Sequence, residues 1–210
     1  MRTAAATYRA RRVVLALPPA LARSIDVALP PPAHTFAAAV QAGAVVKVFA
    51  AYERAFWRER GLSGELYAPR GLVRASVEAT PPRESGGPPA LLAFVVGPAA
   101  HGWAQRSGSE RRAAVLASLA AQLGDEAARP IAVLEHDWSA EAWSGGCVAG
   151  LPPGALGGGA AWRSAHGRLH FAGTEAAVAW PGYMEGALEA GERAAAEVIR
   201  ALGNSPTGHA

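Results

Sequence analysis

The sequence predicts a globular protein of mixed α/β or α+β class, in which strands and helices alternate irregularly and no internal repeat occurs. Half of its 210 residues are apolar and only 18% are charged, so the chain can bury a core and global disorder is excluded. This length fits one sizeable domain or two small, interleaved ones. No apolar stretch approaches the roughly 20 residues that cross a bilayer, so we expect a soluble protein without a membrane span.

The charged residues do not favour nucleic-acid binding. The formal net charge is +3 with both signs interspersed, whereas nucleic-acid-binding domains usually carry a basic stripe or run. The densest basic group, Arg9, Arg11 and Arg12, has three residues, which is too few. The single cysteine, Cys147, forms no internal disulfide, so stability does not depend on an oxidising compartment and we expect a cytoplasmic protein.

The N-terminal segment has two interpretations. Arg12–Leu17 is a short apolar run stopped by Pro18 and Pro19, as expected for a buried strand. Basic residues before this run and Ala20-Leu21-Ala22 after it are also typical of a secretory signal peptide. The strand is favoured because the apolar run is short and prolines follow it.

Val45–Tyr52 predicts a strand that contains the only lysine of the chain. Its period of two places Lys47 on one face with Val45, Phe49 and Ala51. A cation in an apolar face is costly to bury unless it meets a partner or water. The other nineteen residues of the lysine and arginine set are arginine. The lysine at position 47 is therefore either a chance occurrence or a sign that this position requires an ammonium group.

Hydrophobic periodicity and turn residues predict the other elements. The clearest is a helix over Ser107–Leu123, which begins with a capping box formed by Ser107 and Glu110 and stops at Gly124. The remaining predictions are a short helical stretch after Leu29–Pro32, strands at Leu91–Val96, Ile131–His136 and Arg168–Ala172, a helix from about Gly182 to Leu202 capped by Gly203, and a disordered tail over 204–210.

The C-terminal strand, loop and helix form one candidate site. Inside a helix, Gly186 and Gly191 each lower the stability by about 1 kcal/mol relative to alanine. Their presence in the predicted helix therefore calls for a structural or functional explanation. With Gly182, Ala190 and Ala194 they make a face that almost lacks side chains. A ligand at the helix N-terminus and tight helix packing without a ligand both explain such a face.

Ser144-Gly145-Gly146-Cys147 is a second candidate site. A lone cysteine is more often a small buried hydrophobe than a reactive group, although two preceding glycines allow a ligand to approach the backbone. His166 and His170 straddle a loop–strand junction with no acidic ligand nearby, so we expect no metal site. Neither a phosphate-binding loop nor a nucleophile-elbow serine is present, which disfavours a hydrolase.

One set of segments, in a fixed order along the chain, gives a more specific indication. The segments are Val13–Pro19, Val46-Lys47, Phe56-Trp57, Leu62–Gly64, Trp138, Ser144–Cys147, Pro152–Gly154, Phe171–Glu175, Trp180, Gly182–Ala187 and Ala190–Ala195. Together they resemble the C-terminal portion of flavin-containing amine oxidases of the monoamine oxidase type, over roughly Arg11 to Leu202.

The resemblance implies an oxidoreductase that uses FAD. In that family a hydride passes from the α-carbon of an amine to the flavin, the imine hydrolyses to an aldehyde, and O2 is reduced to H2O2. The implied fold is a mixed-sheet substrate domain over 21–135. A partial, Rossmann-like FAD-binding domain, whose N-terminal half is missing, is implied over 1–20 and 136–203.

The resemblance also implies roles for individual residues. Lys47 looks like the lysine that holds a water near flavin N5, Trp138 like a residue packed against the isoalloxazine, and Tyr183 like one wall of an aromatic cage around the amine. Cys147 matches the position that carries the flavin through a thioether in animal monoamine oxidases. The other implied flavin contacts are Gly173, Thr174, Gly182 and Met184.

Two departures from the family pattern leave alternatives open. Val148 occupies the position of the second cage aromatic, which puts the amine selectivity in doubt. The chain also contains no Gly-x-Gly-x-x-Gly turn for the ADP part of FAD. We therefore expect a fragment that is inactive alone and that needs its missing N-terminal half in trans, or a homodimer.

The alternatives are a non-catalytic remnant or binding module with the same substrate-domain fold and, within the enzyme class, an amino-acid or polyamine oxidase. Intact Lys47, Cys147 and Tyr183 argue against the remnant, because an unused site loses such residues.

Overall fold

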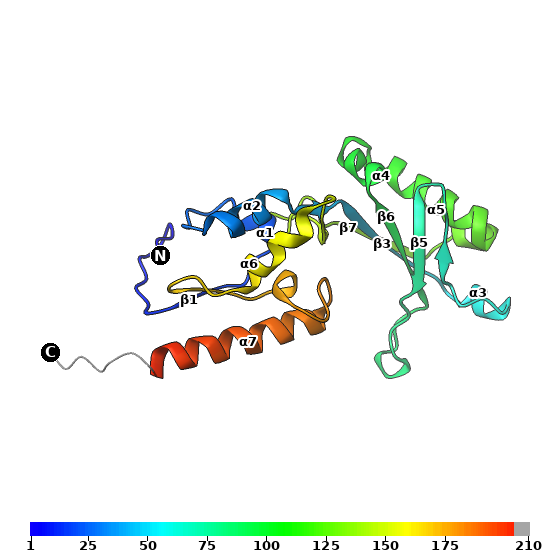
Figure 1. Cartoon of the computed structure of the whole chain (residues 1–210). Coiled ribbons are helices and arrows are strands. Elements are labelled where there is room, and N and C mark those ends of the chain that lie inside the picture. The colour runs from blue at the N-terminus through cyan, green and yellow to red at the C-terminus, as the bar shows by residue number, and fades with distance from the viewer. Residues whose placement is uncertain (204–210) are drawn as a thin grey trace. The chain divides into compact units, whose positions relative to one another are not determined.

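A computed structural model describes residues 1–203 and confirms the mixed α/β class (Figure 1). The chain forms two compact units. The central unit is Gly43–Cys147, and the terminal unit joins Met1–Ala42 to the chain from Val148 onward. The predicted domain bounds group residues 21–42 with the sheet, whereas here they belong to the terminal unit. Residues 136–147 belong to the central unit. The predicted tail at 204–210 lies outside the described residues.

The central unit is built on a five-stranded sheet in the order β4-β5-β6-β3-β7, in which each neighbouring pair is antiparallel. Its strands are β3 (Val45–Ala51), β4 (Leu66–Tyr67), β5 (Val73–Glu78), β6 (Ala90–Val96) and β7 (Ala132–Asp137). The strands predicted at Val45–Tyr52, Leu91–Val96 and Ile131–His136 are therefore confirmed. Sequence reasoning missed β4 and β5, because β4 is two residues long and β5 mixes charged and small residues.

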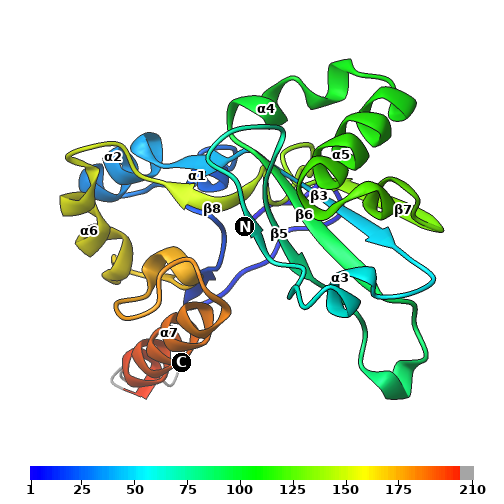
Figure 2. The ribbon, with the colours of Figure 1, turned by 90° about the vertical axis from the view of Figure 1, so that its right-hand side faces the viewer.

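One face of this sheet is covered by helices, as Figure 2 shows for α4 (Pro98–His101) and α5 (Gly108–Leu123). The predicted capping box is present: the Ser107 hydroxyl accepts from the Glu110 N–H, and the Ser107 N–H donates to the Glu110 carboxylate over 2.8 Å. The unit also contains α3 (Phe56–Glu59) and the 3-10 helices η1 (Arg83–Ser85), η2 (Trp103–Gln105) and η3 (Asp125–Ala128).

The core of the central unit lies between the sheet and α5. Val46 and Val48 of β3 face this core and are at most 1% exposed, and they pack in one cluster with Leu119 of α5. Because side chains alternate along a strand, Lys47 and Phe49 point to the opposite face, as predicted. The helices thus leave one face of the sheet open.

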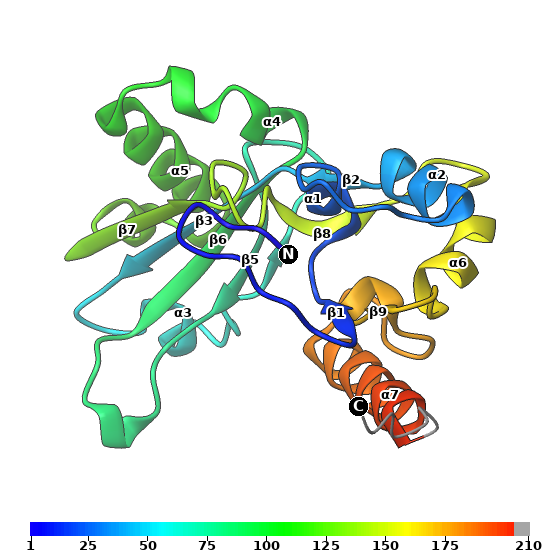
Figure 3. The same cartoon turned by 90° about the vertical axis from the view of Figure 1, so that its left-hand side faces the viewer.

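The terminal unit contains a short parallel strand pair. β1 (Val13–Leu15) pairs with β9 (Leu169–Phe171), so the strand interpretation of the N-terminal segment is confirmed (Figure 3). Leu15, Phe171, Trp162 and Phe36 form its core, and the Trp162 and Phe171 rings lie 4.8 Å apart. Its helices are α1 (Pro19–Ala22), α2 (Pro31–Ala39), α6 (Gly159–Arg163), α7 (Met184–Gly203) and the 3-10 helices η4 (Ala155–Gly158) and η5 (Thr174–Ala176). Two further strands, β2 (Gln41–Gly43) and β8 (Cys147–Gly150), pair with each other.

No helix in the described part of the chain is long and apolar enough to cross a membrane. The longest, α7, begins at Met184, two residues later than predicted, because Gly182 has a φ of 88° and cannot be part of a right-handed helix.

Polar groups attach α7 to β9. The Arg193 guanidinium donates to the Phe171 carbonyl over 2.8 Å and pairs with Glu197 one turn later. The other carboxylate oxygen of Glu197 lies 3.0 Å from Nδ1 of His170, whose side chain is only 3% exposed. Burial alone would raise the pKa of Glu197, but the hydrogen bonds from His170 and Arg193 outweigh it and lower that pKa.

We expect Glu197→Gln to flatten the acid dependence of stability. A carboxylate with a lowered folded-state pKa contributes full stability above its unfolded-state pKa, near 4.5, and loses it as pH falls through the folded-state value. Urea unfolding midpoints measured from about pH 3 to pH 7 check this. Glu192→Gln, an exposed position on the same helix, is the control. A midpoint for Glu197→Gln that falls as steeply with acid as that of the wild type would contradict the assignment.

The two glycines that the sequence singled out in α7 differ in their surroundings. A Cβ on Gly186 would lie 2.0 Å from the carbonyl oxygen of Trp180, whereas one on Gly191 would meet nothing within 4 Å among the described residues. Gly186 therefore allows the close approach of the 177–180 backbone, and Gly191 has no such role there.

Gly186→Ala should lower the free energy of unfolding by about 1–3 kcal/mol, because a backbone carbonyl cannot move aside cheaply. Gly191→Ala should leave it unchanged or raise it by up to about 1 kcal/mol through helix propensity. Urea unfolding followed by circular dichroism measures both, and equal effects would show that the close contact is not what matters.

Candidate functional site

The open face of the central sheet is apolar apart from Lys47 and His136. Lys47 pairs across the sheet with Phe94 on one side and His136 on the other. Phe49 and Leu134, paired two residues along the same face, are 37% and 69% exposed. This face thus combines accessible hydrocarbon surface with the Lys47 ammonium.

Aromatic rings hold the Lys47 ammonium. Its Nζ lies 5.9 Å from the centre of the Phe94 ring and 5.7 Å from that of Trp138. Such distances allow cation–π attraction, which offsets part of the cost of partial desolvation. No ion pair among residues 1–203 includes Lys47. Its N–H donors are therefore not taken up by a carboxylate there.

Trp138 follows β7 and is fixed by its backbone. Its N–H donates to the Val45 carbonyl over 3.1 Å, and its carbonyl accepts from the Ser144 hydroxyl over 3.2 Å. The ring packs against His136 with centres 4.5 Å apart, and His136 in turn contacts Glu141 at 3.1 Å. The indole N–H of Trp138 is buried and has no partner in the described part of the chain.

Phe94 and His136 are site residues that sequence reasoning missed. Their strands were predicted, and alternation alone gives each strand a face. The pairing of Lys47 with these two residues depends on strand order and register, which no local pattern fixes.

Cys147 is a free, half-buried thiol at the start of β8. The two residues before it, Gly145 and Gly146, have φ values of 65° and 140°, which other residues rarely adopt. The backbone is therefore bare of side chains directly before the thiol, as the sequence suggested.

In the terminal unit, the loop between β9 and α7 is held by its own polar groups. The Thr174 hydroxyl donates to the Tyr183 carbonyl over 2.7 Å and lies 3.3 Å from that of Trp180. The Glu189 carboxylate accepts the backbone N–H groups of Val178 and Ala179, and these bonds lower its pKa. Gly173 and Gly182, at φ values of 89° and 88°, bound this loop.

The same loop exposes apolar side chains at the start of α7. Trp180, Tyr183 and Met184 are 55%, 66% and 88% exposed, and the Trp180 and Tyr183 rings lie edge to face with centres 6.0 Å apart. Beside Gly173, burial raises the pKa of Glu175. Exposed rings near a helix N-terminus provide a surface for a flat, partly anionic ligand.

The predicted site residues thus form two groups, each within one unit. Lys47 and Trp138 meet in the central unit, while Gly173, Thr174, Gly182, Tyr183 and Met184 gather in the terminal unit. Cys147 is the last residue of the central unit. The described residues contain no cluster of His, Cys, Asp and Glu that could hold a metal ion.

Comparison with known proteins matches residues 2–199 to the family of flavin containing amine oxidoreductases. A probable flavin-containing monoamine oxidase A of Dictyostelium discoideum is 37% identical over 95% of this chain and 44% of its own length. A flavin-containing amine oxidase of Danio rerio is 38% identical over 93% of this chain and 38% of its own length. This chain therefore spans about two fifths of the length of these relatives.

Solved structures agree. Cyclohexylamine oxidase from Brevibacterium oxydans matches 94% of this chain and 44% of its own, with a TM-score of 0.85 and 37% identity. A putrescine oxidase bound to putrescine matches 90% of this chain and 42% of its own, with a TM-score of 0.82 and 36% identity. The fold is therefore part of a flavin amine oxidase fold, and the chain belongs to the flavin containing amine oxidoreductase family.

Proposed function

We propose that this chain takes part in the FAD-dependent oxidation of a small-molecule amine. A hydride leaves the α-carbon of the amine and a proton leaves its nitrogen, and water hydrolyses the resulting imine to an aldehyde. FAD supplies the two-electron acceptor when bound, and O2 takes up the electrons and two protons as H2O2. The observation that carries this proposal is the lone lysine held between two rings on an apolar sheet face.

We assign to Lys47 the task of holding a water molecule where the flavin accepts hydride and its electrons pass to O2. Lys47 is half-buried beside two rings, and no carboxylate among the described residues forms an ion pair with its ammonium. A compact ammonium can present one N–H to a single water, whereas the guanidinium fork of arginine spreads its donors over a plane.

The remaining chain-borne groups fit the other tasks. The apolar sheet face accommodates the hydrocarbon part of an amine. Trp138 supplies a ring that packs against the flavin, and its indole N–H is buried without a partner among the described residues. Tyr183 supplies an exposed ring as one wall of an amine cage. Relatives named for putrescine and cyclohexylamine support an amine substrate, while one named L-amino acid dehydrogenase keeps amino-acid oxidation as an alternative within the class.

The loop before α7 fits a flat cofactor. Gly173 and Gly182 leave the backbone accessible, Thr174 fixes the loop, and Met184 offers an exposed apolar side chain at the helix start. The unpaired N–H groups of the first helical turn favour an anionic edge of the ligand. Together these features support flavin contact by Gly173, Thr174, Gly182 and Met184.

We further propose that the ADP part of FAD is bound by a nucleotide-binding half that these 210 residues do not contain, and that they are inactive without it. The span of about two fifths of the relatives' length supports this. We place the protein in the cytoplasm, since one cysteine gives no sign of an oxidising compartment. The Cys147 thiol, half-buried behind two glycines, is the proposed covalent attachment point of the flavin.

Visible absorbance after gel filtration tests the cofactor assignment. We expect FAD to stay with the chain when a polypeptide with the Gly-x-Gly-x-x-Gly half is present, and the colour to remain in the acid-precipitated pellet. Cys147→Ser should lose colour on precipitation, while Ser164→Ala, a control at an exposed serine outside the proposed flavin contacts, should retain it. Free FAD in every sample would contradict the flavin role, and a yellow Cys147→Ser pellet would contradict the attachment point.

A further inference from the structure

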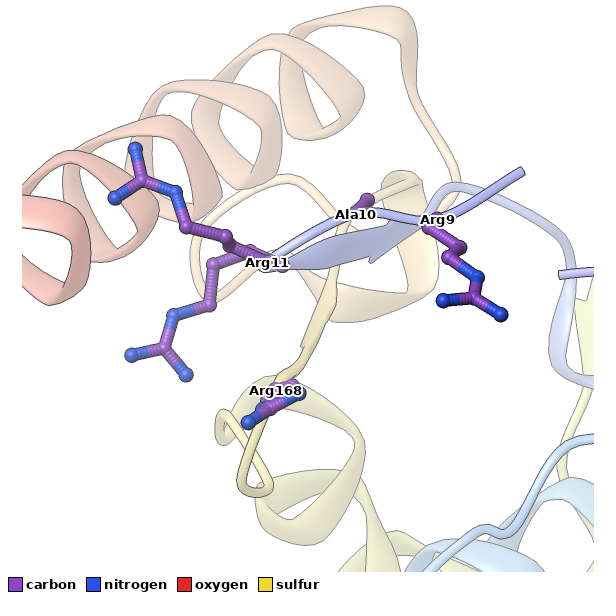
Figure 4. Close-up of a pocket in the computed structure, with 5 residues that line it drawn as sticks. Arg9, Ala10, Arg11 and Arg168 are labelled. Carbon is purple, nitrogen blue, oxygen red and sulfur yellow. The ribbon is translucent and has the colours of Figure 1, made fainter. Parts of the chain in front are cut away.

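Four arginines contribute to the lining of a hollow of about 390 Å³ in the terminal unit, which we call the arginine hollow (Figure 4). Its lining consists of Arg9, Ala10, Arg11, Arg12 and Arg168. Figure 4 shows Arg9 and Arg11 on the segment that leads into β1, and Arg168 on the separate segment that leads into β9. The sequence indicated only the first group, because Arg168 is more than a hundred residues away along the chain.

Backbone and side-chain hydrogen bonds hold the two segments in place. The Val13 N–H donates to the Arg168 carbonyl over 2.9 Å, and Arg12 donates to the carbonyls of Gly167 and Ala201 over 3.3 and 3.2 Å. Arg12 is thus committed to structure. Arg9, Arg11 and Arg168 are exposed, and their guanidinium groups are available to a ligand.

The positive charge of the arginine hollow is not neutralised within the described chain. Arg54, Arg58, Arg111 and Arg193 each pair with a glutamate. None of the ion pairs among residues 1–203 involves an arginine of the hollow. An anion that binds these guanidinium groups would neutralise part of this positive charge.

The hollow lies at the opposite end of the strand pair from the proposed flavin contacts. β1 and β9 are parallel, and the hollow is lined by residues that precede both strands. Gly173 and Thr174 follow β9. An anion in the hollow would therefore lie away from the flavin contacts proposed above.

We propose that the arginine hollow binds an anion with two or more linked phosphate groups. A guanidinium fork binds two oxygens of one phosphate or carboxylate, so a single carboxylate engages fewer of these arginines than a diphosphate does. The volume falls in the range of small-ligand pockets, and arginines confined to one hollow fit a compact anion better than a nucleic-acid strand, which needs an extended basic track.

Isothermal titration of the 210-residue chain with inorganic pyrophosphate at low salt tests this proposal. We expect one site, with affinity reduced about tenfold or more by Arg11→Gln and by Arg168→Gln. Arg168→Lys, which keeps the charge but removes the fork, should fall between the wild type and Arg168→Gln. Arg23→Gln, at an exposed arginine of the same unit outside the hollow, should bind as the wild type does.

Other ligands identify the source of the phosphates. Equal affinities for ADP and pyrophosphate would show that the phosphates alone are recognised, as proposed. The proposal is overturned if pyrophosphate does not bind, if sulfate binds as tightly, or if Arg23→Gln loses as much affinity. Tighter binding of single-stranded DNA that grows with strand length would also overturn it, in favour of a nucleic-acid surface.

Discussion

The half-buried ammonium of Lys47 is the constraint on which the central unit depends. A cation on an apolar face is costly unless something compensates it, and here the rings of Phe94 and Trp138 do so from an adjacent strand and from the segment after β7. That arrangement requires the strand order β6-β3-β7 and its register. Because α5 covers the other face, this is the face of the sheet left for a ligand.

In the terminal unit, several contacts hold an exposed apolar loop in one conformation. Gly186 brings the start of α7 against the Trp180 backbone, Thr174 binds the Tyr183 carbonyl, and Arg193 ties the helix to the end of β9. The loop can therefore expose Trp180 and Met184 without packing them into its own core. A ligand that covers these side chains removes apolar surface from water, which favours binding.

Local patterns predicted the elements that strong periodicity or capping defines, such as the Lys47 strand, the capped helix α5 and the strand at Val13–Leu15. They missed β5, whose alternation is weak. Gly186 and Gly191 are equivalent in the sequence pattern, but of these two glycines only Gly186 has a close backbone neighbour among the described residues. Likewise, the neighbours of Lys47 depend on register, and Arg168 joins the N-terminal arginines through the parallel pairing of β1 and β9.

The most direct test of the proposed function is the rate at which reduced flavin, held by the chain together with its nucleotide-binding half, reacts with O2. The flavin is first bleached anaerobically by an amine and then mixed with air-saturated buffer. We predict that Lys47→Met slows the return of the flavin absorbance by about a hundredfold, because the water that Lys47 positions is lost, and that Lys47→Arg does not restore it. Wild-type rates in both variants, or a flavin that no amine bleaches, would contradict the account.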